Sequence, residues 1–77
     1  MTRSKDLTRT QLAQALRRHG IERDRTLPGY WIVYRETDKN GRPTRQVAMP
    51  DPAGKTNRQK LAALIRKRKQ AVEAYKP

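Results

Sequence analysis

The chain contains no cysteine, a single histidine and no long apolar run. The missing cysteine excludes disulfide bonds, thiolate metal ligands and a cysteine nucleophile. A single histidine excludes a histidine-rich zinc site, so we expect neither a metal nor a cofactor. No segment approaches the ~18 apolar residues of a membrane span, and no apolar segment follows Met1 as a secretory signal. These absences predict a cytoplasmic protein that does not associate with membranes.

Acidic residues are also scarce. The 77 residues include 7 Asp and Glu against 19 Lys and Arg, so the formal net charge is +12. A chain of this length predicts one small domain, residues 1–77, whose core contributes at most roughly 3–5 kcal/mol. Repulsion among the excess cations lowers the stability of this domain further. Because basic residues extend from Arg3 to Lys76 rather than forming a tail, the charge indicates an anionic partner, usually nucleic acid.

A helix is predicted within residues 7–20, after a polar segment at residues 1–6 that we expect to be frayed. Thr8 and Gln11 have the spacing of a capping box, in which each side chain satisfies a free backbone amide. Gly20 can adopt the left-handed conformation that ends a helix in a Schellman motif.

A β-hairpin is predicted over residues 30–49. Tyr30-Trp31-Ile32-Val33-Tyr34 is the only aromatic and β-branched run, and Asn40-Gly41 is a favoured two-residue turn. This turn places Tyr34 opposite Val47. A type I turn with a bulge at the same position would shift the register by one residue, and this alternative stays open.

The two-residue turn also divides the hairpin between two faces. It opposes Ile32 to Met49 and Glu36 to Arg45. The face turned toward the core would carry Tyr30, Ile32, Tyr34, Val47 and Met49. The outward face would carry Trp31, Val33, Arg35, Thr44, Gln46 and Ala48.

A second helix is predicted over residues 56–76, with a capping box formed by Thr56 and Gln59. Its inward stripe would consist of Leu61, Leu64, Ile65, Arg68, Val72 and Tyr75. We expect the Arg68 side chain to extend to the edge of this stripe and into solvent. The expected fold is α+β: a helix, a hairpin and a C-terminal helix packed on the sheet. A third, short edge strand around residues 25–27 is compatible with this arrangement.

Catalytic motifs are absent or incomplete. The seven carboxylates lie mostly beside basic residues, and none lies in an apolar run that would raise its pKa. Gly54-Lys55-Thr56 resembles the end of a phosphate-binding loop, but Met49 stands where that motif requires glycine. The amides of the helix start, with Lys55, could still hold one backbone phosphate. The sequence therefore predicts a protein that is not an enzyme.

The outward face of the hairpin is the best candidate site. Arg35 can bond guanine and Gln46 can bond adenine, and a two-stranded ribbon fits the DNA major groove. The candidate nucleic-acid-binding residues are Arg35, Lys39, Arg42, Thr44, Arg45, Gln46, Lys55, Arg58, Arg66, Lys67 and Lys69. Trp31 is a candidate for stacking on bases or docking on a partner, and it could equally cover the apolar residues of the first helix. A helix-turn-helix is disfavoured by the strand pattern after the first helix, whereas a small winged arrangement stays open.

The hairpin and the second helix resemble a known family. The order Leu27-Pro28, Gly29 to Glu36, a turn with Gly41-Arg42, a second strand and a basic helix resembles the N-terminal arm-binding domain of phage tyrosine-recombinase integrases. The resemblance covers residues 27–76. It implies a small three-stranded sheet that is packed on one helix and inserted into the DNA major groove.

By this resemblance, Arg35, Thr44 and Gln46 would contact DNA. The chain departs from the family in having a capped helix before the sheet and no catalytic domain after it, so we expect no recombinase activity. The predicted function is non-enzymatic binding of duplex DNA by a phage or plasmid regulator or accessory factor. Two alternatives stay open. One is RNA binding in a ribosomal or regulatory particle. The other is a protein-binding module that acts on host transcription machinery through Trp31, Val33 and Ala48.

Overall fold

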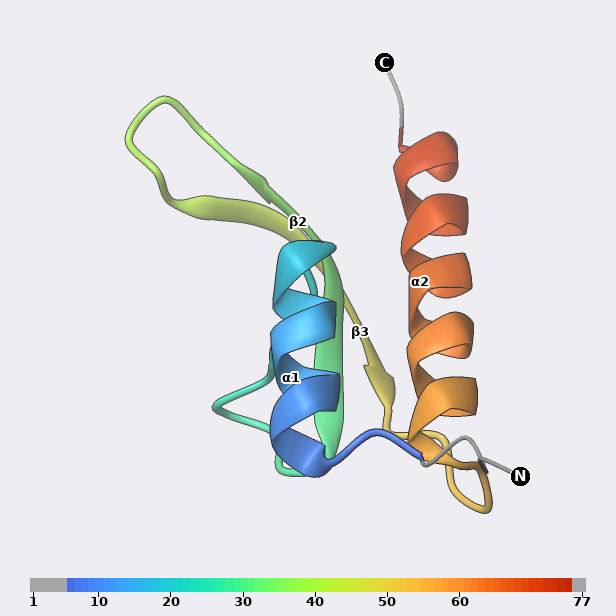
Figure 1. The fold of residues 1–77 in the computed structure, drawn as a ribbon. Coiled ribbons are helices and arrows are strands. Elements are labelled where there is room, and N and C mark those ends of the chain that lie inside the picture. The colour runs from blue at the N-terminus through green and yellow to red at the C-terminus, as the bar shows by residue number, and fades with distance from the viewer. Residues whose placement is uncertain (1–5, 76–77) are drawn as a thin grey trace, which may run out of the picture.

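The computed structural model describes residues 6–75, which form two helices and one three-stranded sheet. The elements are α1 (Arg9–Arg18), β1 (Glu22–Arg23), β2 (Tyr30–Thr37), β3 (Pro43–Pro50) and α2 (Asn57–Ala74). The strands are antiparallel in the order β1-β2-β3, and the two helices lie side by side against one face of the sheet (Figure 1). The fold is therefore α+β with the C-terminal helix packed on the sheet, as predicted. Within residues 6–75 no helix covers the opposite face of the sheet.

Both helices begin and α1 ends as local sequence signals predict. Capping boxes are present at both helix starts, formed by Thr8 with Gln11 and by Thr56 with Gln59. After α1 the chain turns through Gly20, whose φ is 79°. The next amide bonds back to the last turn, which completes the predicted Schellman motif.

The turn between β2 and β3 is a type I turn followed by a bulge at Gly41. The Gly41 amide donates to the Asp38 carbonyl at 3.1 Å, and the Asp38 amide donates to the Arg42 carbonyl at 2.8 Å. Among the described residues only glycines have positive φ, so Asn40 is not left-handed. A two-residue type I′ turn needs positive φ at both central residues, so that turn is wrong and the alternative turn is confirmed. The register slip expected to accompany it does not reach Glu36, which opposes Arg45 as first predicted.

Two bulges set the register of β2 against β3. The first lies at Thr44 and restores the predicted pairing through to Tyr34. The second lies at Val33, and beyond it each pair is shifted by one residue, so that Ile32 opposes Ala48. The predicted partner of Ile32 is therefore wrong, because each extra residue changes which side chains face each other.

The bulge at Val33 also changes the faces of the sheet. Trp31 and Val33 are 3% and 0% exposed, so their predicted outward placement is wrong. They form the core with Leu12, Leu16, Ile21 and Leu64, and Tyr34, Val47 and Met49 pack against it as predicted. Tyr30, predicted to face inward, is 37% exposed. Ile32 is buried but does not belong to this core cluster.

Helix α2 follows the predicted stripe for its first three turns only. Leu64 is fully buried, and Leu61 and Ile65 pack against the core. Val72 and Tyr75 are each 39% exposed, whereas Ala71 is buried. The inward placement of Val72 is therefore wrong, whereas the Tyr75 ring faces the sheet and stacks on Tyr34 although it stays partly exposed.

Arg68 does not extend into solvent as predicted. Its Nη1 atom donates to the Val33 carbonyl at 2.9 Å and lies 3.4 Å from the Gly20 carbonyl. A bulge leaves its extra residue without a ladder partner, so this guanidinium supplies the missing donor. Arg68 thereby joins α2 to the end of α1 and to the middle of β2.

The short edge strand and the N-terminal segment also differ from prediction. The edge strand is β1 at Glu22–Arg23, whereas residues 25–27 belong to a turn. In that turn Asp24 accepts hydrogen bonds from the Thr26 hydroxyl and amide, which hold the pKa of Asp24 below its ordinary value. Asp6, expected to be frayed, makes defined contacts with α2. The rest of the predicted frayed segment and the predicted helix end at Lys76 lie outside the described residues.

Candidate nucleic-acid interface

The face of the sheet opposite the helices carries the pair that sequence analysis singled out. Arg35 on β2 and Gln46 on β3 are directly opposed in the register, and the Arg35 Nε atom donates to Gln46 Oε1 at 3.3 Å. Both side chains line a surface hollow of about 380 Å³, together with Ile32 and residues 22–26. The sheet therefore presents two base-compatible side chains next to each other.

An acidic side chain competes for Arg35. The Arg35 Nη1 atom lies 3.5 Å from Glu22 Oε2, and these side chains are 38% and 56% exposed. An exposed pair of this kind contributes at most about 1 kcal/mol, so a ligand can displace Glu22 at little cost. Glu22 also keeps the guanidinium over the outer face of the sheet.

The distal end of the hairpin extends beyond the helices (Figure 1). Lys39, Arg42 and Thr44 lie in this end and are exposed. The Asp38 carboxylate accepts hydrogen bonds from the amides of Asn40 and Arg42, both at 2.9 Å, and so orders the turn. The cations of the turn are thus carried on an ordered, protruding ribbon.

Arg45 is turned toward the other face of the sheet. Its guanidinium lies 4.3 Å from the centre of the Tyr75 ring and 3.3 Å from Glu36 Oε1. Tyr75 in turn stacks on Tyr34 with ring centres 5.5 Å apart. Burial, and then the hydrogen bond from the Tyr34 hydroxyl to Glu36, raises the pKa of Tyr34. Arg45 therefore anchors the end of α2, and the structure does not place it with Arg35 and Gln46.

The predicted cations of α2 lie away from the outer sheet face, because α2 packs on the opposite side. The exposed members of this group are Arg58, Arg66, Lys67 and Lys69, and Lys55 is exposed in the loop before the helix. Lys67 borders a hollow that also involves Val47 of β3. The predicted site residues thus form two groups on opposite sides of the sheet.

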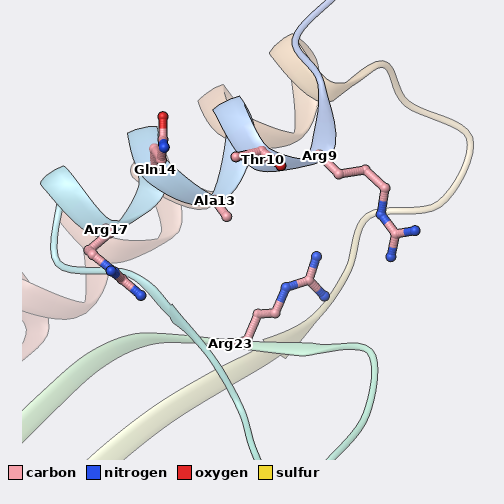
Figure 2. A pocket seen from close by; sticks show the side chains of 6 residues that line it. All are labelled: Arg9, Thr10, Ala13, Gln14, Arg17 and Arg23. Carbon is pink, nitrogen blue, oxygen red and sulfur yellow. The ribbon is translucent and has the colours of Figure 1, made fainter.

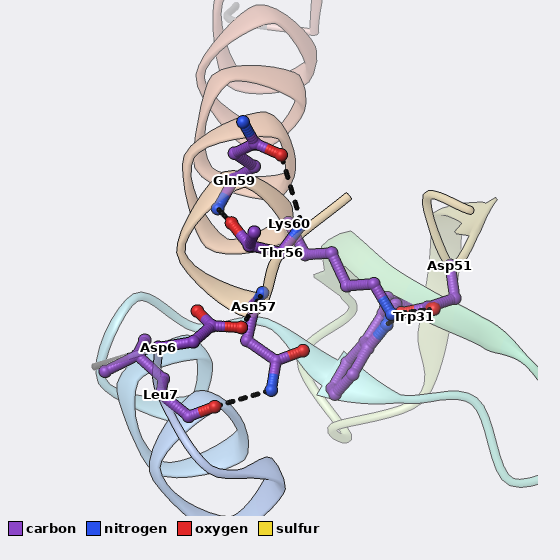
Figure 3. A network of polar contacts seen from close by, with 8 residues as sticks. All are labelled: Asp6, Leu7, Trp31, Asp51, Thr56, Asn57, Gln59 and Lys60. Atoms are coloured by element: carbon purple, nitrogen blue, oxygen red, sulfur yellow. Dashed lines mark hydrogen bonds and ion pairs between the residues drawn. The ribbon is translucent and has the colours of Figure 1, made fainter. Parts of the chain in front are cut away.

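Trp31 is not available for stacking or docking, because only 3% of it is exposed. Its Nε1 atom donates to Asp51 Oδ1 at 2.8 Å, and Lys60 binds the other carboxylate oxygen at 2.8 Å (Figure 3). Partial burial alone would raise the pKa of Asp51, but the hydrogen bonds from Lys60 and Trp31 outweigh it and lower the pKa. Trp31 therefore packs in the core beside α1, in agreement with the second alternative from sequence analysis, in which it covers the apolar residues of the first helix.

The start of α2 is occupied by the protein itself. The Asp6 carboxylate accepts hydrogen bonds from the amides of Asn57 at 2.8 Å and Arg58 at 2.9 Å, and Asn57 Nδ2 donates to the Leu7 carbonyl (Figure 3). Hydrogen bonds from these amides hold the pKa of Asp6 below its ordinary value. The predicted phosphate contact assumed free amides, and an internal carboxylate occupies those of Asn57 and Arg58. The role of Lys55 in binding nucleic acid stays a prediction.

Sequence analysis missed a third group of cations. Arg9 and Arg17 of α1 and Arg23 of β1 line one hollow between these elements (Figure 2). The spacing of Arg9, Ala13 and Arg17 by four residues was the available signal, because such positions share one helix face. No sequence signal could have added Arg23 to this group, because its place beside α1 depends on where β1 packs in the folded structure.

Comparisons of the chain with known protein families, with curated proteins and with solved structures find no match. The resemblance to integrase arm-binding domains stays a prediction. Residues 6–75 contain no group of His, Asp or Glu side chains that could hold a metal ion. Neither helix in this part of the chain combines the length and apolar character needed to cross a membrane.

Proposed function

We propose that the protein binds duplex DNA, without catalysis, through the outer face of the β2–β3 ribbon. The observation that carries the proposal is the Arg35–Gln46 pair, side by side on the sheet face that the helices leave open. A guanidinium matches O6 and N7 of guanine, and a carboxamide matches N6 and N7 of adenine. A two-stranded ribbon fits a major groove about 12 Å wide.

The protruding turn adds contacts that fix position rather than sequence. Lys39 and Arg42 lie at the end of the ribbon, where the phosphates flanking a groove would pass. The net charge of +12 favours rapid and salt-dependent capture of a polyanion. The resemblance to integrase arm-binding domains is the reason for assigning the role of a phage or plasmid regulator or accessory factor.

Duplex sequences selected from a random pool provide the test. Binding of a selected and a scrambled duplex is measured by fluorescence anisotropy at several salt concentrations. Arg35→Ala and Gln46→Ala should each reduce the preference for the selected duplex by roughly 5- to 150-fold, the equivalent of about 1–3 kcal/mol. Lys67→Ala is the control, and it should weaken binding to both duplexes equally.

Equal losses on both duplexes from all three variants would refute groove reading. Tighter binding to structured RNA than to any duplex would replace the proposal with the RNA alternative. The docking patch proposed for a protein partner is disfavoured, because Trp31 and Val33 are buried. Capture of a protein that persists after nuclease treatment would nevertheless restore that class.

A further inference from the structure

The hollow between α1 and β1 gathers positive charge without a carboxylate. It has a volume of about 370 Å³ and is lined by Arg9, Thr10, Ala13, Gln14, Arg17 and Arg23. Arg9, Ala13 and Arg17 share one face of α1 because they are four residues apart. Figure 2 shows the small side chain of Ala13 between the two arginines, with Arg23 reaching up from β1. Three guanidinium groups therefore surround one open space.

The nearby carboxylates line adjoining hollows rather than this one, Asp51 beside Arg9 and Arg23 and Glu22 beside Arg17 and Arg23. Arg9 and Arg17 make no ion pair with any carboxylate of residues 6–75. Alternation along β1 separates Glu22 from Arg23, and Glu22 pairs with Arg35 on the outer face. The carboxylate whose pKa responds to Arg23 is Asp51, which already binds Trp31 and Lys60.

One of the three guanidinium groups, that of Arg23, is held in place. The Arg23 guanidinium lies 4.6 Å from the centre of the Trp31 ring, and that ring is held in the core by its bond to Asp51. Helix α1 is fixed by its capping box and by the buried side chains of Leu12 and Leu16. Arginine donors in fixed positions suit the tetrahedral oxygens of phosphate, which they can bind through two parallel hydrogen bonds.

A path leads from this hollow to the outer sheet face. A second hollow of about 320 Å³ also contains Arg17 and Arg23 and adds Arg25. The hollow beside Arg35 shares Arg23 and Arg25 with it. Arginines therefore continue from α1 around the edge strand β1 to the pair proposed to read bases, with Glu22 lining both of these hollows and Asp24 the second.

We infer that Arg9, Arg17 and Arg23 form a binding site for a backbone phosphate of the same duplex. The inference rests on the proposed function for the identity of its ligand, since it adds a backbone clamp beside the groove-reading face. Arg17 supplies from α1 a guanidinium that forms no ion pair within residues 6–75, and Arg23 supplies from the sheet a guanidinium that lies over the Trp31 ring. The duplex would thus be held on two sides of β1.

The matched pair Arg17→Gln and Arg18→Gln tests this site. Both changes remove one charge from exposed positions in the last turn of α1, but only Arg17 lines the hollow. Binding to a labelled random-sequence duplex is measured between 50 and 200 mM salt. Arg17→Gln should reduce the slope of log affinity against log salt by about 0.9, which makes the affinity loss over this range about 3.5-fold smaller. Arg18→Gln should keep the wild-type slope, and equal slopes for the two variants would overturn the inference.

A titration with inorganic tripolyphosphate separates this inference from the proposed function. Side-chain NMR signals of Arg9, Arg17 and Arg23 should shift, whereas that of Arg18 should not. Shifts without any duplex binding would uphold the phosphate site and refute the proposed function. The opposite outcome has two parts: Arg35→Ala loses sequence preference, and Arg17→Gln and Arg18→Gln have equal salt slopes. It would uphold the proposed function and refute the phosphate site. Unfolding midpoints of both variants check that the fold is retained.

Discussion

Replacement of Arg68 by methionine should destabilise the fold by about 1.5–3 kcal/mol. Methionine keeps most of the aliphatic stem but removes the donor that bonds the Val33 carbonyl at 2.9 Å. Val33 is fully buried, so water cannot replace the lost donor. A hydrogen bond from a charged group contributes about 1.5–3 kcal/mol, and the 3.4 Å contact with Gly20 adds little at that distance.

This loss is large for so small a protein. At about 0.05–0.15 kcal/mol per residue, a chain of 77 residues has a free energy of unfolding of about 4–12 kcal/mol. With a urea m value of about 1–1.5 kcal/mol/M, the unfolding midpoint should fall by about 1–3 M. The transition can be followed by the fluorescence of Trp31, which is buried only in the folded state.

Lys69→Met is the control, because it removes the same charge from an exposed position one residue away. Its effect should stay within about 0.5 kcal/mol, as for most surface changes. This comparison cancels the relief of repulsion that any loss of positive charge brings. If the two variants unfold at the same urea concentration, the proposed support of the bulge by Arg68 is refuted.

Two further substitutions test other contacts that join the helices to the sheet. Gly20→Ala should cost about 1–2 kcal/mol for its positive φ of 79° and more because its Cβ would lie 3.0 Å from the Arg68 guanidinium. The second part should disappear in an Arg68→Met background, and strict additivity in urea unfolding would contradict this coupling. Asp51→Asn should destabilise the protein at pH 6, where the carboxylate binds Lys60 and Trp31. Because the folded pKa of Asp51 lies below its ordinary value of 3.8, this stabilisation is complete above that value and is lost as the pH falls through the folded pKa. The difference between variant and wild type should therefore shrink below pH 3.8, and a constant difference from pH 6 to pH 2 would contradict the assignment.

Local signals predicted the features that depend on neighbouring residues. The capping box of Thr8 with Gln11 and the stop at Gly20 involve residues within a few positions of each other. The same holds for the capping box that begins α2. Such interactions form in any context that permits the helix, so the sequence alone specifies them.

The candidate site was predicted only in part. Arg35 and Gln46 were placed opposite each other correctly, because the bulge at Thr44 compensates for the longer turn. Trp31 was placed on the wrong face, because strict alternation cannot anticipate an extra residue at Val33. The extra residue at Val33 thus leaves Arg35 and Gln46, the pair proposed to read bases, on the outer face of the sheet and turns Trp31, the ring proposed to stack on bases, into the core.

Long-range contacts account for the remaining differences. Asp6 reaches the start of α2 across most of the chain, and Arg68 reaches back to Val33 and Gly20. No spacing rule connects residues so far apart, since their meeting depends on how the helices pack against the sheet.

The sequence by itself determined the order of the elements, the ends of α1, the hairpin and the strong positive charge. Periodicity, capping residues and turn glycines act over a few residues, and charge is a property of composition. Only the tertiary structure decided which face of β2 is buried, which anion occupies the start of α2 and which arginines share a hollow. Each of these depends on a bulge or a contact whose energy exists only once α1, α2 and the sheet are packed together.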